Sequence, residues 1–87
     1  MNAIQEVRNA VNEKIKDVLE VEEVTSTDFL GQKVTVIPAG NCLVVQAFGE
    51  TFGRLEKAEV TRQVQSAAWL WVKERYSPEE AMEVLGK

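Results

Sequence analysis

The sequence contains no histidine and only one cysteine, Cys42. Without histidine, neither a Ser-His-Asp nor a Cys-His nucleophile system can be assembled. One cysteine without histidine also excludes a disulfide within the chain and a zinc site of the usual kind. The sequence indicates no pair of carboxylates for acid–base catalysis, although it does not show which carboxylates lie close together in space. We expect no catalytic residues, no metal and no cofactor, and we expect that the protein is not an enzyme. Cys42 lies in an apolar run, and we interpret it as a small buried hydrophobic residue.

Long apolar runs are also missing. None approaches the roughly 18 residues that a membrane-spanning helix needs. The first 20 residues carry charges throughout and do not resemble a signal peptide. These features predict a soluble, cytoplasmic protein. The 87 residues predict a single domain, 1–87, with a thin core and little room for a small-molecule substrate.

The net charge is −4 and originates in the first half of the chain. Residues 1–50 carry eight acids and four bases, whereas residues 51–87 carry six of each. A mildly acidic chain argues against nucleic-acid binding, because neutralisation of phosphates supplies most of that affinity. The acidic run Glu20–Glu23 lacks the spacing of a calcium-binding loop, and we interpret it as the solvated end of a helix.

Residues 3–19 show the clearest helical period. Their apolar side chains recur every three or four residues and predict one buried face: Ile4, Val7, Val11, Ile15 and Val18, flanked by Ala10 and Leu19.

The period then changes to that of β-strands. Residues 33–38 and 41–48 predict a hairpin around the turn Pro38–Asn41, and residues 22–28 predict a weaker strand before it. Both faces of residues 42–48 are apolar, which indicates a central or doubly covered strand.

The remaining sequence predicts a loop and two helices. Residues 49–53 begin and end with glycine and predict a loop, from which the side chain of Phe52 packs into the core. A long helix is expected from Leu55 to Tyr76. Ser77, Pro78 and Glu80 then form a capping-box signature for a short helix, 78–85, ended by Gly86.

The predicted fold is therefore α+β: an N-terminal helix, a three-stranded antiparallel sheet, a long helix and a short C-terminal helix. The order α-β-β-β-α also occurs in double-stranded-RNA-binding domains, and the resemblance is limited to topology. Those domains carry a lysine-rich start to the second helix. Here that segment reads RLEKAEVTR, in which Glu56 and Glu59 dilute the bases, so membership of that family is not inferred.

The long helix carries both tryptophans, Trp69 and Trp71, which a helical period of 100° per residue places on opposite sides. One apolar stripe is predicted to face the sheet: Val60, Val64, Ala67 and Trp71, with Ala68 at its edge. A second stripe is formed by Trp69, Val72 and Tyr76.

Two explanations of the second stripe remain open. In the first, the last helix folds back and covers Trp69 and Tyr76 with Ala81, Met82 and Leu85. In the second, the stripe binds a protein partner or another copy, because Trp, Tyr, Met and Arg are enriched at interfaces. The predicted partner-binding residues are Trp69, Val72, Arg75, Tyr76 and Met82.

The leading hypothesis is a small protein-interaction module that acts through this aromatic helix face, as a homodimer. One alternative is a phage or mobile-element inhibitor, accessory or assembly protein that binds a larger host or viral protein. The other is a nucleic-acid-binding module of αβββα topology, which would use Arg54 and bases of the long helix such as Arg62 and Lys73.

Overall fold

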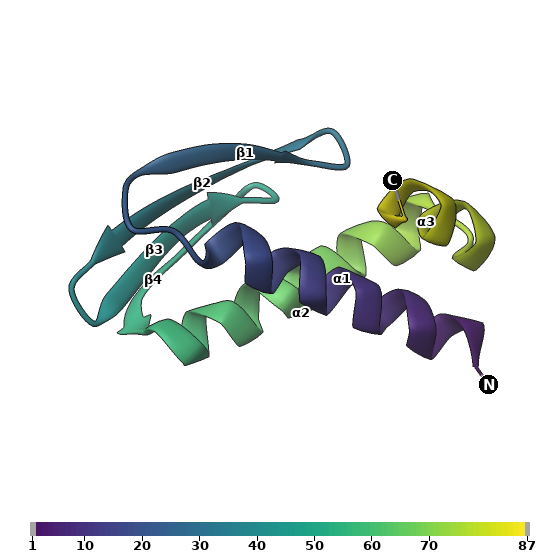
Figure 1. Ribbon diagram of the computed structural model, residues 1–87, viewed down its shortest axis with the longest axis horizontal. Helices are drawn as coiled ribbons and strands as arrows, with labels where there is room; N and C mark the ends of the chain where they lie inside the picture. The colour runs from purple at the N-terminus through teal and green to yellow at the C-terminus, as the bar shows by residue number, and fades with distance from the viewer. Residues whose placement is uncertain (1, 87) are drawn as a thin grey trace.

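The computed structural model describes residues 2–86, except for the side chain of Arg54. The elements, in chain order, are α1 (Ala3–Leu19), β1 (Thr25–Phe29), β2 (Gln32–Ala39), β3 (Cys42–Ala47), β4 (Glu50–Glu56), α2 (Lys57–Arg75) and α3 (Pro78–Leu85). The four strands form one antiparallel sheet in the order β1-β2-β3-β4. Figure 1 shows α1 and α2 on one side of this sheet, with α3 beyond its end. The α+β class is confirmed, while the prediction of three strands is wrong.

The strand missing from the prediction is β4, which occupies the segment expected to be a loop. The turn before it is Phe48–Gly49, and both residues have a positive φ, of 54° and 74°. Hairpins favour such turns, but a bulky residue rarely adopts this conformation, so Phe48 gives no turn signal in the sequence. Phe48 is held by its N–H, which donates to Oε1 of Gln32, and by ring contacts with Phe29 and Trp71.

Gly53 also made β4 difficult to predict, because glycine weakens the sequence pattern of a β-strand. It lies where the register between β3 and β4 shifts, between Leu43 and Val45. A Cβ at Gly53 would lie 3.0 Å from Cγ2 of Val44 and 3.3 Å from its Cα. Glycine thus permits the close approach of β4 to β3 at an irregularity of the ladder. Phe52 does join the core, but from a strand instead of a loop.

The core lies between the helices and the inner face of the sheet. Helix α1 buries Val7, Val11 and Ile15, as its period predicts, and also Leu19, which was expected only to flank this face. The other two residues predicted on this face are not buried, since Val18 is half-buried and Ile4 is 53% exposed. On β3, which is central as expected, the side chains of Leu43, Val45 and Ala47 are buried. Those of Cys42 and Val44, on the other face, are half-buried. Cys42, which was predicted to be buried, is thus only half-buried, because the described helices cover only one face of the sheet.

The buried stripe of α2 differs from the predicted one. Its fully buried residues are Val60, Val64, Ala68 and Val72, spaced four apart. Trp71 and Ala67 are half-buried. Trp71, the largest side chain, was predicted near the middle of the buried stripe. Close packing of α2 against α1 and the sheet instead favours small and β-branched residues at these positions. Helix α2 begins at Lys57 because Leu55 and Glu56 belong to β4.

Candidate protein-binding groove

A groove of about 410 Å³ lies where three helices meet, beyond the end of the sheet. The first two turns of α1, the last two turns of α2 and the start of α3 form its walls. The lining residues are Ile4, Gln5, Arg8, Trp69, Lys73, Tyr76, Ser77, Pro78 and Ala81. The groove is therefore built from both ends of the chain, which no local sequence pattern brings together.

The local chemistry of the chain explains why the three helices meet. The amide of Gln65 donates to the backbone oxygen of Asn12 at 3.0 Å and ties α2 to α1. Ser77 and Glu80 form a reciprocal capping box, in which each accepts from the backbone N–H of the other at 3.3 Å. The box starts α3 directly after α2, and α3 packs on α1 with Ala81 buried.

The two tryptophans occupy different environments. Trp69 is half-buried in the wall of the groove. Trp71 belongs to an aromatic cluster with Phe48, 6.0 Å between ring centroids, and with Tyr76 at 6.2 Å. The guanidinium of Arg75 lies 4.5 Å from the centroid of the Trp71 ring. Trp71 is thus fixed by its own neighbours, whereas one side of Trp69 faces the open groove.

The residues predicted to bind a partner are distributed over several sites. Trp69 and Tyr76 line the groove together. Val72 is fully buried in the core and offers no surface for contact. Arg75 stacks on Trp71, and Met82 is 39% exposed on α3 but does not line the groove.

Sequence reasoning missed Ile4, Gln5, Arg8, Lys73 and Pro78 as members of the site. No local pattern marked these residues: Ile4 was predicted to be buried but is 53% exposed, and Gln5 and Arg8 belong to the polar side of α1. The intramolecular explanation describes part of the arrangement, because Ala81 does close one end of the groove beside Trp69 and Tyr76.

The charge of the groove differs in sign from that of the chain. Its lining contains two bases, Arg8 and Lys73, and no acid, although the net charge is −4. Among the described side chains, the ion pairs are Arg62–Glu59 and Arg75–Glu74, so neither groove base is neutralised by a carboxylate.

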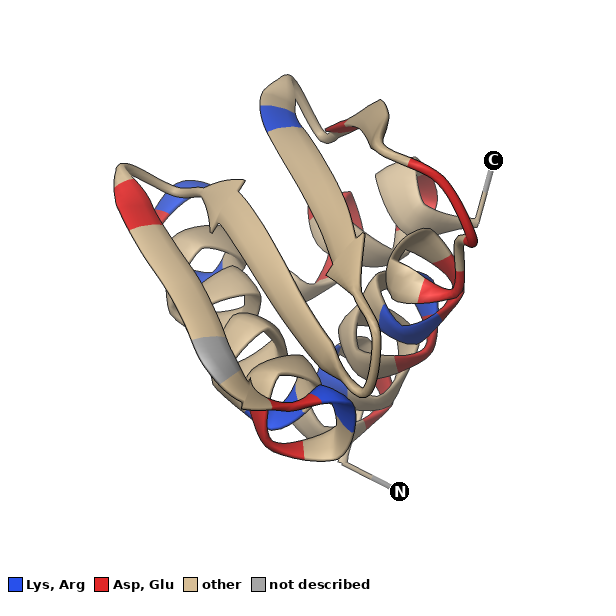
Figure 2. Cartoon of the chain, turned by 90° about the vertical axis from the view of Figure 1, so that its left-hand side faces the viewer, with Lys and Arg blue, Asp and Glu red and all other residues tan. Residues whose placement is uncertain are grey.

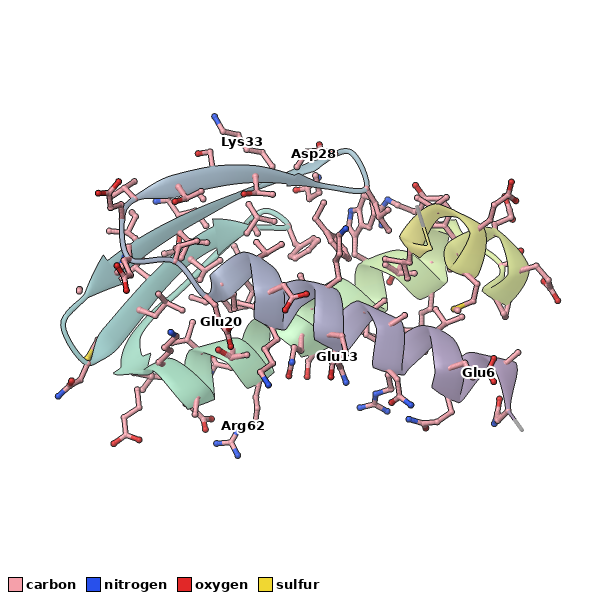
Figure 3. The ribbon with its side chains drawn as sticks, in the orientation of Figure 1. Glu6, Glu13, Glu20, Asp28, Lys33 and Arg62 are labelled. Atoms are coloured by element: carbon pink, nitrogen blue, oxygen red, sulfur yellow. The ribbon has the colours of Figure 1, made fainter. Side chains whose placement is uncertain are left out.

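Arg8 also lines a smaller hollow of about 220 Å³ along the seam between α1 and α2, with Asn12, Arg62, Gln65 and Ser66. This hollow likewise has no acid in its lining. Figure 3 shows Arg62 pointing away from the sheet. The sheet itself presents little charge, because the charged residues of Figure 2 lie mainly on the helices and near the ends of strands. The helices therefore carry most of the charge, of both signs, whereas the linings of the groove and of the smaller hollow contain bases without an acid.

The groove offers apolar walls and two cations, without a histidine, cysteine or carboxylate in its lining. Within residues 2–86, no cluster of three or more metal-ligating side chains of the His, Cys, Asp and Glu types is found. No polar or charged side chain is buried among the residues whose burial is described. No helix in this part of the chain has the length and apolar character to cross a membrane. This arrangement suits recognition of an apolar and negatively charged group.

Comparison of the chain with protein-family models, with curated proteins and with solved structures finds no match.

Proposed function

We propose that the protein is a small interaction module that binds a protein partner through the groove around Trp69 and Tyr76, with a second copy of itself as the first partner. The observation that supports this is the half-buried indole of Trp69 beside the uncovered Ile4, in a groove between three helices. Aromatic side chains in partly desolvated pockets are the usual energetic centres of protein interfaces.

A protein ligand suits this groove better than a nucleic acid does. Its walls are largely apolar, formed by Ile4, Trp69, Pro78 and Ala81, with Arg8 and Lys73 as the bases. Two bases on a chain of net charge −4 provide few phosphate contacts, and the affinity for nucleic acid grows with their number. An inhibitor or accessory protein that binds a larger protein would use the same surface.

The test is sedimentation equilibrium of the purified chain over a wide concentration range, with two variants. Trp69→Ser removes the indole from the groove and is expected to weaken association at least about tenfold, since hot-spot truncations cost 2 kcal/mol or more. Leu70→Ser is the matched control. Leu70 is the next residue on the same helix, is 50% exposed and does not line the groove.

Circular dichroism of both variants checks that they remain folded. Equal association of the wild type and Trp69→Ser would refute the interface. A monomeric wild type would refute the homodimer, and the groove would then be tested by capture of an identified partner that binds the wild type but not Trp69→Ser. Retention of labelled RNA or DNA at low salt, lost in Arg8→Glu, would show instead that the bases bind phosphate.

A further inference from the structure

Neither base of the groove forms an ion pair with a described acidic side chain. Arg8 and Lys73 are exposed and lie on different helices, α1 and α2, and both line the groove with Trp69. An occupant that satisfies them needs carboxylates next to an apolar side chain. Exposed acids stand beside the most exposed large apolar side chain of the described residues, Val24, in one segment of this same chain.

The connection between α1 and β1, residues Glu20–Val24, has this chemistry. Glu20, Glu22 and Glu23 are exposed, and none of them forms an ion pair with a described side chain. Val24 is 68% exposed, more than any other large apolar side chain among the described residues. The chain has no base between Lys16 and Lys33, so nothing on the segment itself offsets its negative charge.

This segment cannot reach the groove of its own molecule. Helix α1 separates the two sites: the groove contains Ile4 and Arg8 near its start, and the acidic segment follows its end at Leu19. Seventeen residues of helix span about 25 Å. Figure 1 shows the N-terminal end of α1 beside α3, and the connection to β1 at the opposite end. A contact between the segment and a groove therefore joins two molecules.

We infer that the groove binds the acidic segment Glu20–Val24 of a second copy, with Glu22 and Glu23 near Arg8 and Lys73 and with Val24 against Trp69. In this dimer, a two-fold axis passes near the middle of α1, so that the two copies of α1 run in opposite directions. The start of each α1 then lies near the end of the other, and each groove receives the partner's segment. Such a contact closes on itself and gives a dimer instead of a filament. The inference rests on the proposed function, because it names the occupant of the same groove.

Charge reversal tests the pairing directly. Variant R8E/K73E carries an acidic groove and an acidic segment, and variant E22K/E23K carries a basic groove and a basic segment. Each alone is expected to dimerise at least about tenfold more weakly than the wild type, because like charges then face each other. Mixed in equal amounts, the two are expected to form a heterodimer, since both of its groove–segment contacts again join opposite charges.

The matched control is K33E/K57E, which makes the same change of net charge at two exposed bases outside the groove. It is expected to keep an association within about threefold of the wild type at 0.15 M salt, where distant exposed charges are largely screened. Sedimentation equilibrium measures all these variants. All substituted side chains are exposed, and circular dichroism checks that the fold is kept.

The outcomes separate this inference from the proposed function. A dimer that R8E/K73E and E22K/E23K leave intact, or a mixture that stays as weak as its components, overturns the groove–segment contact. If Trp69→Ser still weakens that dimer, the groove remains the interface and its occupant is another segment. A wild type that is monomeric at every concentration overturns the inference and the homodimer together.

Discussion

The helices α1 and α2 run through two parts of the molecule: a sheet end, where the sheet covers them, and a helical end, formed by helices alone. The two ends differ in what covers these helices. Beneath the sheet, Ile15, Val60 and Val64 have no exposed surface, because the inner faces of the strands lie against them. Beyond the sheet, only α3 covers α1 and α2, and it is eight residues long. Large apolar side chains stay exposed there on all three helices: Ile4, Leu70, Met82 and Val84.

This difference shows where a chain of 87 residues can place a binding surface. Its apolar residues suffice to close one layer of sheet over one layer of helices. At the helical end, the described elements leave a groove open between α1, α2 and α3. We therefore expect the packing of the sheet end to determine the stability of the fold, and the groove of the helical end, with the exposed segment Glu20–Val24 as its occupant, to determine association. Substitutions in the core of the sheet end and in the groove should separate these two properties.

The largest effect on stability is expected at the sheet end from Phe29→Ala. The Phe29 ring is 1% exposed and meets Phe48 edge-on at 6.0 Å. Its removal leaves a cavity under β1 and should lower the free energy of unfolding by about 3–5 kcal/mol.

Urea denaturation, followed by circular dichroism, measures this loss. The matched variant at the helical end is Leu70→Ala, which truncates a half-exposed side chain and should change the free energy of unfolding by less than about 1 kcal/mol. Equal losses in the two variants would show that the helical end is as tightly packed as the sheet end.

A smaller effect, confined to the helical end, is expected from Ser77→Ala. The change removes the hydroxyl that accepts from the N–H of Glu80 and should cost about 1 kcal/mol. Helix α3 has only eight residues and depends on this cap, so the loss should appear as local opening.

Amide hydrogen exchange should show faster exchange in α3 and unchanged protection in β2 and β3. Ser66→Ala, at an exposed position inside α2, is the control and should leave both regions unchanged. Uniformly faster exchange in both regions after Ser77→Ala would mean that the two ends unfold as one unit.

The two ends also differ in what could be predicted from the sequence. The apolar period of residues 3–19 and the capping box at Ser77 are local patterns, and the structure contains both helices. Strand β4 could not be predicted, because Phe48 adopts a left-handed conformation that only its contacts with Phe29, Trp71 and Gln32 make acceptable. Those contacts are tertiary and have no local signature.

Only part of the groove could be predicted from the sequence. Trp69 and Tyr76 were identified because two indoles on opposite sides of one helix cannot share one buried face. Arg8 and Lys73 were not paired, since 64 positions separate them and only the antiparallel packing of α1 and α2 brings them to one groove. Val72 was predicted in the second stripe but is fully buried. A helical wheel gives the direction of a side chain around the helix, but not how closely a neighbouring helix approaches it.

The smallest effect is expected from Arg75→Gln, which tests the boundary between the two ends. The Arg75 guanidinium stacks on Trp71 and donates to its backbone oxygen at 3.3 Å, while half of the side chain stays exposed. Its loss should therefore cost only about 0.5–1 kcal/mol of unfolding free energy in urea denaturation. Because Arg75 does not line the groove, self-association should stay within about threefold of the wild type in sedimentation equilibrium.

The charge-matched control is Arg62→Gln, which breaks an exposed pair with Glu59 and should cost no more than about 0.5 kcal/mol. If Arg75→Gln weakened association as much as Trp69→Ser does, the binding surface would extend from the groove across the aromatic cluster of Trp71, Tyr76 and Phe48.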